Sequence, residues 1–127
     1  MPGAWARRVG VALTGIFALF MALDVGIKLL GLPVVDETLA TLGWPAGAGW
    51  WIGLLQLGLL ALYLGPRTAV LGAVLMTGLL GGAVATHLRV GSPVATHVLF
   101  GVYLGLLAWG GLWLRDARLR SVLIHWA

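Results

Sequence analysis

Two histidines in an apolar chain are the residues whose spacing first suggests chemistry. His87 and His97 each end a copy of Ala-Thr-His, and the connection between the copies contains Arg89, a glycine and a Ser-Pro pair. Imidazole groups donate, accept and relay protons near neutral pH, and a guanidinium group binds oxyanions. Thr86 directly precedes His87. Together these residues suggest a site for acid–base chemistry or ligand binding. The alternatives are that both histidines are interfacial residues or helix caps, and that Arg89 is a topology charge or contacts a lipid phosphate.

Three further polar residues lie singly inside apolar segments. Asp24 and Lys28 are four residues apart, so on a helix they share one face and can form an ion pair. Gln56 lies in a separate apolar segment. Charged groups deep in a membrane are costly unless they pair or meet water, so we expect these residues to find partners. The alternative is structural: Lys28 extends its amine to the interface, and Gln56 only links helices.

The composition places these residues in a membrane. Of the 127 residues, 61% are hydrophobic and 9% are charged, whereas about a quarter of the residues of a soluble domain are charged. Cysteine is absent, which excludes disulfide exchange and Cys-ligated zinc or iron–sulfur centres. The formal net charge is +4, but most arginines flank apolar segments, which is typical of membrane topology. We therefore expect membrane lipid, and no nucleic acid, as a partner.

Apolar stretches of about twenty residues predict transmembrane helices. The predicted fold is all-α, a four-transmembrane-helix bundle that makes residues 1–127 a single integral membrane domain. The predicted spans are residues 9–31, 46–65, 67–88 and 93–114, followed by an amphipathic tail, 115–127, whose His125 and Trp126 lie at the membrane interface. The first span is expected to be an uncleaved helix rather than a signal peptide.

Glycines spaced four residues apart are expected to let these helices pack closely, and they leave open whether the chain forms a homo-oligomer. The three pairs are Gly49 with Gly53, Gly78 with Gly82, and Gly101 with Gly105.

The distribution of arginine predicts the orientation of the bundle. Six arginines lie on the side of the termini: Arg7, Arg8, Arg67, Arg115, Arg118 and Arg120. The positive-inside rule then puts both termini in the cytoplasm, in a bacterial-type cytoplasmic membrane. The short linker after the first span faces outward, with Trp44, Trp50 and Trp51 at the outer interface.

Every predicted span contributes polar groups to the outer half of the membrane, so we expect an outward-facing polar pocket. The residues expected to carry chemistry are Asp24, Lys28, His87 and Arg89. The residues expected to bind a ligand are Gln56, Trp51, Thr86 and His97.

Four stretches carry a family resemblance: "GIKLLG" after the first polar pair, "LGWP" in the linker, "GGAVATHLRVG" at the end of the third span and "WLRDARLR" after the fourth. From about Gly10 to Leu123 the chain resembles the DoxX-like family of small four-helix integral membrane proteins. The resemblance implies that Lys28, His87 and Arg89 occupy the family's recurring polar positions. Relatives often carry Glu where this chain has Gln56, so this chain lacks an ionisable group at that position.

The resemblance also implies a link to quinone-dependent oxidation, because some members are subunits of thiosulfate:quinone oxidoreductase, while others are associated with oxidative-stress and thiol-handling systems. A quinone or other lipophilic small molecule would find hydrogen-bond donors in His87 or His97, and Lys28 and Arg89 would stabilise negative charge on its oxygens. The chain itself shows no electron carrier, so electrons would come from a partner redox protein.

Other functions stay open. The protein would alternatively be a non-enzymatic membrane scaffold or assembly factor. A haem held by His87 and His97 is less favoured, and a zinc site with these histidines and a carboxylate of the outer loop is less favoured still. A channel or transporter is disfavoured, because the inner half of the bundle is apolar.

Overall fold

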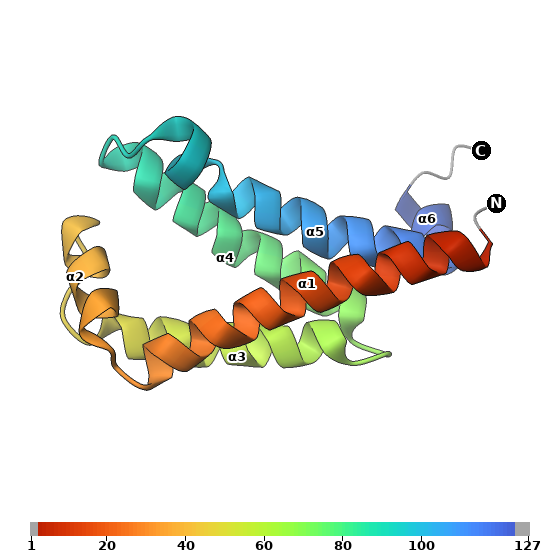
Figure 1. The fold of residues 1–127 in the computed structure, drawn as a ribbon, viewed down its shortest axis with the longest axis horizontal. Coiled ribbons are helices and arrows are strands. Elements are labelled where there is room, and N and C mark those ends of the chain that lie inside the picture. Colours follow the sequence, from red (N-terminus) through yellow and green to blue (C-terminus); the bar gives the residue numbers. More distant parts are fainter. Residues whose placement is uncertain (1–2, 124–127) are drawn as a thin grey trace.

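The computed structural model describes residues 3–123, which are helical apart from short connections (Figure 1). The four long helices are α1 (Ala4–Leu29), α3 (Ala48–Leu64), α4 (Ala69–Arg89) and α5 (Phe100–Arg115). The shorter elements are α2 (Pro33–Thr41), the π-helical turn η1 (Val94–Val98) and α6 (Ala117–Leu123). The predicted all-α fold is confirmed for these residues. His125 and Trp126, expected at the interface, lie outside the described residues.

The four long helices form a closed ring in which each packs against two others. α1 contacts α3 and α5, and α4 contacts the same two helices. α2 lies across one end of the bundle, and α6 lies at the other end near the start of α1 (Figure 1). The core contains Phe17, Tyr63, Met76 and Leu112, all almost completely buried. The rings of Phe17 and Tyr63 meet edge to face, with centroids 5.2 Å apart, which fixes α1 against α3.

Glycines set the closest helix approaches. A Cβ atom at Gly10 of α1 would lie 2.8 Å from the carbonyl oxygen of Gly111 in α5. A Cβ atom at Gly72 of α4 would overlap the backbone of Tyr63 in α3. Any side chain at these points would push the helices apart.

The three predicted glycine pairs behave differently from one another. A Cβ atom at Gly49 or Gly53 would clash with a neighbouring helix, and one at Gly101 would lie 2.9 Å from the Leu80 carbonyl oxygen. At Gly78 and Gly82, by contrast, a Cβ atom would meet nothing within 4 Å. The prediction that these two glycines bring helices together is therefore wrong, because α4 faces open space at both positions.

Within residues 3–123, three segments are long and apolar enough to cross a membrane: α1, α4 and the stretch Val94–Arg115. α3 is apolar but has only 17 residues. The predicted span 93–114 is not one continuous α-helix, because η1 interrupts it. In η1 the amide of Val98 donates to the carbonyl of Pro93, five residues earlier, and regular α-helix begins at Phe100.

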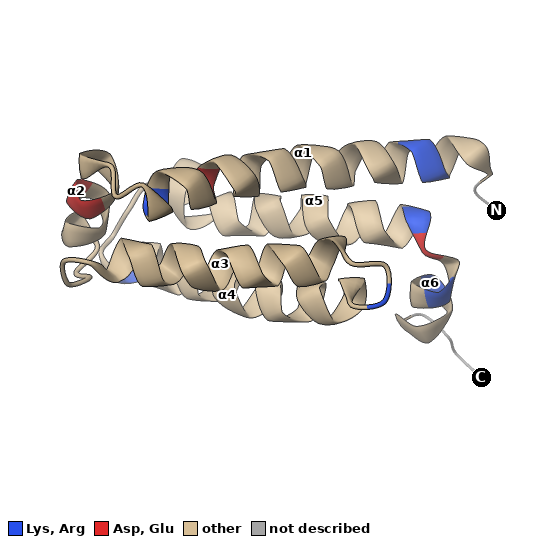
Figure 2. Ribbon diagram, turned by 90° about the horizontal axis from the view of Figure 1, so that it is seen from below, with Lys and Arg blue, Asp and Glu red and all other residues tan. Residues whose placement is uncertain are grey.

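The charged residues separate along the bundle axis (Figure 2). Six of the eight Lys and Arg residues lie at the end that carries the start of α1, the α3–α4 connection and α6. The opposite end carries Lys28 and Arg89, with Asp36 and Glu37 on α2. The outer surface between the two ends is apolar, since side chains such as Leu19, Leu23 and Leu106 are more than 60% exposed. This pattern is that of a membrane-embedded protein.

Candidate functional site

A cavity of about 740 Å³ lies inside the α2 end of the bundle. All four long helices, η1 and α2 contribute to its wall. Most of that wall is apolar and includes Phe20, Leu55, Leu79, Phe100 and Leu104. Ligand pockets typically enclose about 300–1,000 Å³ and are lined mainly by apolar side chains with a few polar groups. We call this space the main cavity.

Small residues on α4 keep the main cavity open. Gly78, Gly82 and Ala83 lie on its wall, and the two glycines have no neighbouring atoms where a Cβ would stand. The spacing of Gly78 and Gly82 places them on one face of the helix. Their small size therefore contributes volume, rather than helix contact, at this level of the bundle.

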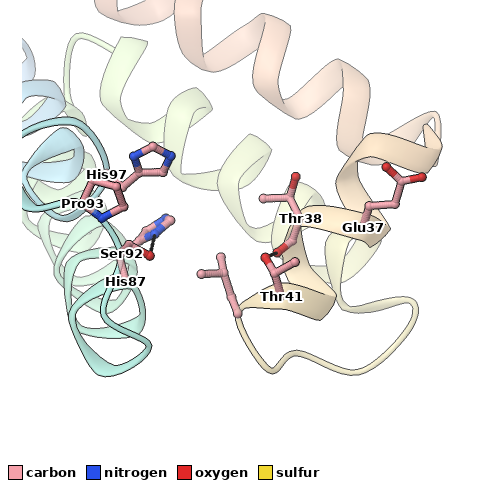
Figure 3. Close-up of a pocket in the computed structure, with 8 residues that line it drawn as sticks. Glu37, Thr38, Thr41, His87, Ser92, Pro93 and His97 are labelled. Atoms are coloured by element: carbon pink, nitrogen blue, oxygen red, sulfur yellow. Dashed lines mark hydrogen bonds between the residues drawn. The ribbon is translucent and has the colours of Figure 1, made fainter.

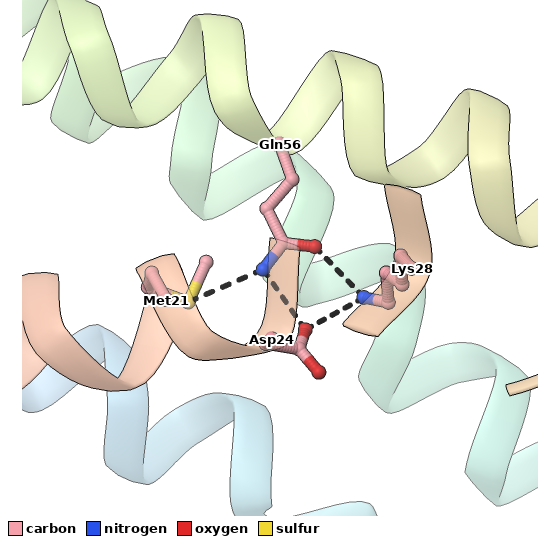
Figure 4. A network of polar contacts seen from close by, with 4 residues as sticks. All are labelled: Met21, Asp24, Lys28 and Gln56. Carbon is pink, nitrogen blue, oxygen red and sulfur yellow. Dashed lines mark hydrogen bonds and ion pairs between the residues drawn. The ribbon is translucent and has the colours of Figure 1, made fainter. Parts of the chain in front are cut away.

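One polar network stands on the wall of the main cavity (Figure 4). Lys28 Nζ donates to Asp24 Oδ2 and to Gln56 Oε1, both at 2.7 Å, and Gln56 Nε2 donates to the same Asp24 oxygen at 2.9 Å. The predicted ion pair of Asp24 and Lys28 is confirmed. Gly53, three residues before Gln56, makes this meeting possible, because a Cβ there would lie 2.8 Å from the Cβ of Lys28. α1 and α3 therefore approach closely where the network forms.

Gln56, at one side of the network, is buried in the protein, while Lys28 and Asp24 are accessible from the main cavity. Gln56 is 2% exposed, whereas the side chains of Lys28 and Asp24 are 18% and 26% exposed. Among residues 3–123, Asp24 Oδ1 accepts no hydrogen bond, and Lys28 uses two of its three N–H groups. One strong acceptor and one strong donor thus remain side by side for another molecule.

A second, smaller hollow of about 380 Å³ lies between α2 and the α4–η1 connection (Figure 3). We call it the outer hollow. Thr38, Leu42, His87 and His97 line both it and the main cavity, so the two spaces adjoin at the histidines. Glu37 contributes the only carboxylate among the residues that line the outer hollow.

The two histidines contact each other at this junction. Their ring centroids are 5.7 Å apart and the rings meet edge to face. His87 Nδ1 bonds to Ser92 Oγ at 3.0 Å, and His97 Nδ1 bonds to Thr96 Oγ1 at 2.8 Å. Each ring is held through Nδ1, which leaves its Nε2 for another partner.

The sequence pattern that defines the DoxX-like family matches residues 12–111. The protein belongs to the DoxX-like family. The match includes every polar residue of the main cavity wall, from Asp24 to His97. No curated protein and no solved structure matches the chain.

The main cavity of this DoxX-like protein brings together six of the eight expected site residues: Asp24, Lys28, Gln56, Thr86, His87 and His97. Thr86 lies on the wall one residue before His87. These six residues come from four elements that are separate in the chain, α1, α3, α4 and η1, so their convergence is a property of the tertiary fold.

Arg89 and Trp51 lie outside both spaces. Arg89 lines neither cavity, and its Nη2 donates to the main-chain oxygen of Leu42, at the end of α2, over 2.8 Å. We call this contact the Arg89–Leu42 clasp. Trp51 is 68% exposed and packs against the adjacent Trp50, with ring centroids 4.9 Å apart. Trp51 does not line the main cavity, although Ile52, Leu55 and Gln56 of the same helix do.

Several wall residues were not expected from the sequence. Thr38 comes from α2, and Met21 Sδ lies 3.6 Å from the amide nitrogen of Gln56. Glu37, also on α2, is a carboxylate of the outer loop of the kind considered above beside the two histidines. Met21 is three residues before Asp24, so the helical spacing places both on one face. The linker's polar residues, among them Asp36 and Glu37, are consistent with a short surface helix, and α2 is such a helix.

The described residues, 3–123, contain no group of three or more His, Cys, Asp or Glu side chains arranged to hold a metal ion. A haem ligated by both histidines would need its plane between the two rings. Because His87 and His97 touch edge to face, the rings would have to separate to admit it.

Proposed function

We propose that this DoxX-like protein binds a lipophilic small molecule with a polar head group in the main cavity, and that a quinone is one such molecule. The observation that carries the proposal is a cavity of about 740 Å³ with apolar walls around one polar network. Such walls suit a hydrocarbon tail or ring, while Lys28 and Asp24 suit the head.

The charge distribution supports a multi-pass arrangement in which the main cavity opens outward. With α1, α3, α4 and α5 as four spans, the arginine-rich end would face the cytoplasm of a bacterial-type membrane. α3, at 17 residues, is at the short end of the range of about 17–25 residues that span a bilayer. The exposed apolar side chains of the long helices would then contact lipid.

In this proposal the head group lies against Lys28 and Asp24, and the tail extends along Phe20, Phe100 and Leu104. A bound quinone would supply the capacity to accept electrons and protons. Lys28 would donate a hydrogen bond to an oxygen of the head group, and His87 and His97 would hold protons at the junction with the outer hollow. In an oxidoreductase system the electrons would come from a partner protein.

Thermal unfolding in nanodiscs with added ubiquinone or menaquinone analogues tests the proposal. A ligand that binds the folded state raises the unfolding temperature with concentration. Gly82→Leu should abolish that rise, because the new side chain enters the main cavity. Gly81→Leu is the matched control, since Gly81 is the next residue on α4, has open space around it and does not line the cavity.

An equal response in the two leucine variants would contradict binding in the main cavity. Absence of any response in the wild type, together with co-purification of a stoichiometric partner protein, would favour the scaffold or assembly role instead.

A further inference from the structure

We infer that the main cavity selects an uncharged head group that both accepts and donates a hydrogen bond, such as a hydroxyl, over carboxylate, sulfonate or ammonium head groups. This inference rests on the proposed function and narrows its ligand class. It follows from the charge and the unused hydrogen-bonding atoms of Asp24, Lys28 and Gln56.

The polar network carries no net charge at the point where a head group would lie. Of the residues that the structure describes, Asp24 and Lys28 are the only Asp, Glu, Lys or Arg residues that line the main cavity, and their charged atoms are 2.7 Å apart. An anionic head group drawn to Lys28 would meet the carboxylate of Asp24 at nearly the same distance. A cationic head group drawn to Asp24 would likewise meet the ammonium group of Lys28. Either ion would lose its hydration without gaining a net counter-charge, which is costly in an apolar cavity.

His87 and His97 do not change this balance at the network. They line the same cavity, but they lie at its junction with the outer hollow, where Glu37 is also present. The network itself is formed by α1 and α3, on a different part of the wall. A head group bound to Lys28 and Asp24 therefore responds first to those two charges.

The unused atoms of the network match a hydroxyl group. Lys28 retains one N–H group, and Asp24 Oδ1 accepts no hydrogen bond within residues 3–123. In Figure 4 the free carboxylate oxygen points away from Gln56. A hydroxyl can accept from Lys28 and donate to Asp24 at once. A carbonyl can only accept, so it would leave Asp24 Oδ1 without a partner, and leaving a desolvated charged group unpaired is unfavourable.

For a quinone-type ligand, the same geometry gives an order of affinity. The hydroxylated, reduced form makes two charge-assisted hydrogen bonds at the network, and the carbonyl form makes one. The reduced form should therefore bind more tightly.

A tail-matched series tests the inference: decanol, decanesulfonate and decylammonium, added to the full chain in nanodiscs at neutral pH. The wild type should bind decanol about tenfold more tightly than either ion, because only the ions lose hydration without a net counter-charge. Asp24→Asn leaves Lys28 as the unpaired charge, so its preference should move to decanesulfonate. Lys28→Met leaves Asp24, so its preference should move to decylammonium. The double variant Asp24→Asn/Lys28→Met carries neither charge and should again favour decanol. It replaces a single variant in the comparison if that variant fails to fold.

The outcomes separate the two proposals. A wild type that binds an ion as tightly as decanol, or single variants that keep the wild-type order, would overturn the head-group inference while leaving a ligand cavity. A wild type that binds none of the three compounds would overturn the proposed function itself. As an independent arm, decylbenzoquinone should bind more weakly than its hydroquinone under anaerobic conditions, and the opposite order would contradict the inference.

Discussion

Arg89 Nη2 donates a hydrogen bond to the main-chain oxygen of Leu42, 2.8 Å away, and so joins the end of α4 to the end of α2. Leu42 lines both the main cavity and the outer hollow. The next residue, Gly43, takes a φ of +88° and passes directly beside the guanidinium group. The clasp therefore positions α2 across the end of the bundle where the main cavity lies.

Arg89→Met should loosen α2 without unfolding the bundle. The side chain keeps its length but loses the donor, and a hydrogen bond of this type is worth on the order of 1 kcal/mol at a partly exposed position. Hydrogen exchange followed by mass spectrometry should show faster exchange over residues 33–47. Arg67→Met is the control, since Arg67 is exposed and makes no side-chain hydrogen bond within residues 3–123. Equal protection in both variants would show that α2 does not depend on the clasp.

Gly43→Ala should destabilise the protein more than Gly47→Ala. Both glycines have a left-handed φ, +88° and +86°, so alanine is strained at either position by roughly 1 kcal/mol. Only at Gly43 does the new Cβ also meet another group, since it would lie 2.7 Å from Arg89 Nη2. The difference between the two variants, measured by chemical denaturation in detergent, should disappear in an Arg89→Ala background. A difference that persists there would have to come from some other contact.

Exchanging the acid and the amide of the network, Asp24→Asn with Gln56→Glu, should restore part of the stability that either single change removes. Gln56→Glu loses the donor to Asp24 and sets two carboxylates beside Lys28, while Asp24→Asn removes the ion pair. The double variant again has one carboxylate, one amide and one ammonium group. We expect the single changes to be non-additive, with a coupling of roughly 1–3 kcal/mol in the double-mutant cycle. Strictly additive unfolding free energies would mean that the three side chains do not interact as the geometry indicates.

Gly72→Ala should lower the unfolding temperature strongly, because the new methyl group overlaps the backbone of Tyr63 where α3 crosses α4. Overpacking of this kind typically costs about 1–3 kcal/mol or more. Gly78→Ala on the same helix is the control. Its Cβ meets nothing within 4 Å, and alanine favours the helix over glycine by about 1 kcal/mol. Similar losses at both positions would argue against the close crossing at Gly72.

The sequence predicted best those features that depend on a single helix. Asp24 and Lys28 pair because positions four apart share a face, whatever the rest of the chain does. Their link to Gln56 requires a particular rotation of α3 against α1, for which the sequence offered only the polarity of Gln56 as a signal. The apolar segments likewise indicated helices, but not the π-helical turn after Pro93.

The sequence could not predict features that depend on where a backbone group or an empty space lies. The charge of Arg89 can be read from the sequence, so a ligand was the expected partner. The sequence does not show that the main-chain carbonyl of Leu42 lies within hydrogen-bonding distance. Gly78 and Gly82 were expected to pack helices, because a glycine pair has the same appearance whether it faces a neighbouring helix or a cavity. Trp51 adjoins a wall residue in sequence, yet a step of one residue turns a helix by about 100° and carries its ring outward.

Left-handed glycines stand on both sides of α2, Gly31 with a φ of +69° and Gly43 with a φ of +88°. Glycine adopts such angles without the steric cost that other residues carry, so the chain can turn sharply at either end of the short helix. We expect any motion of α2 about these two turns to change how fast a ligand enters and leaves the main cavity, and not how tightly the cavity holds it. Weakening the clasp should therefore speed association and dissociation in equal proportion and leave Kd unchanged, whereas a change at Lys28 should act mainly on residence time.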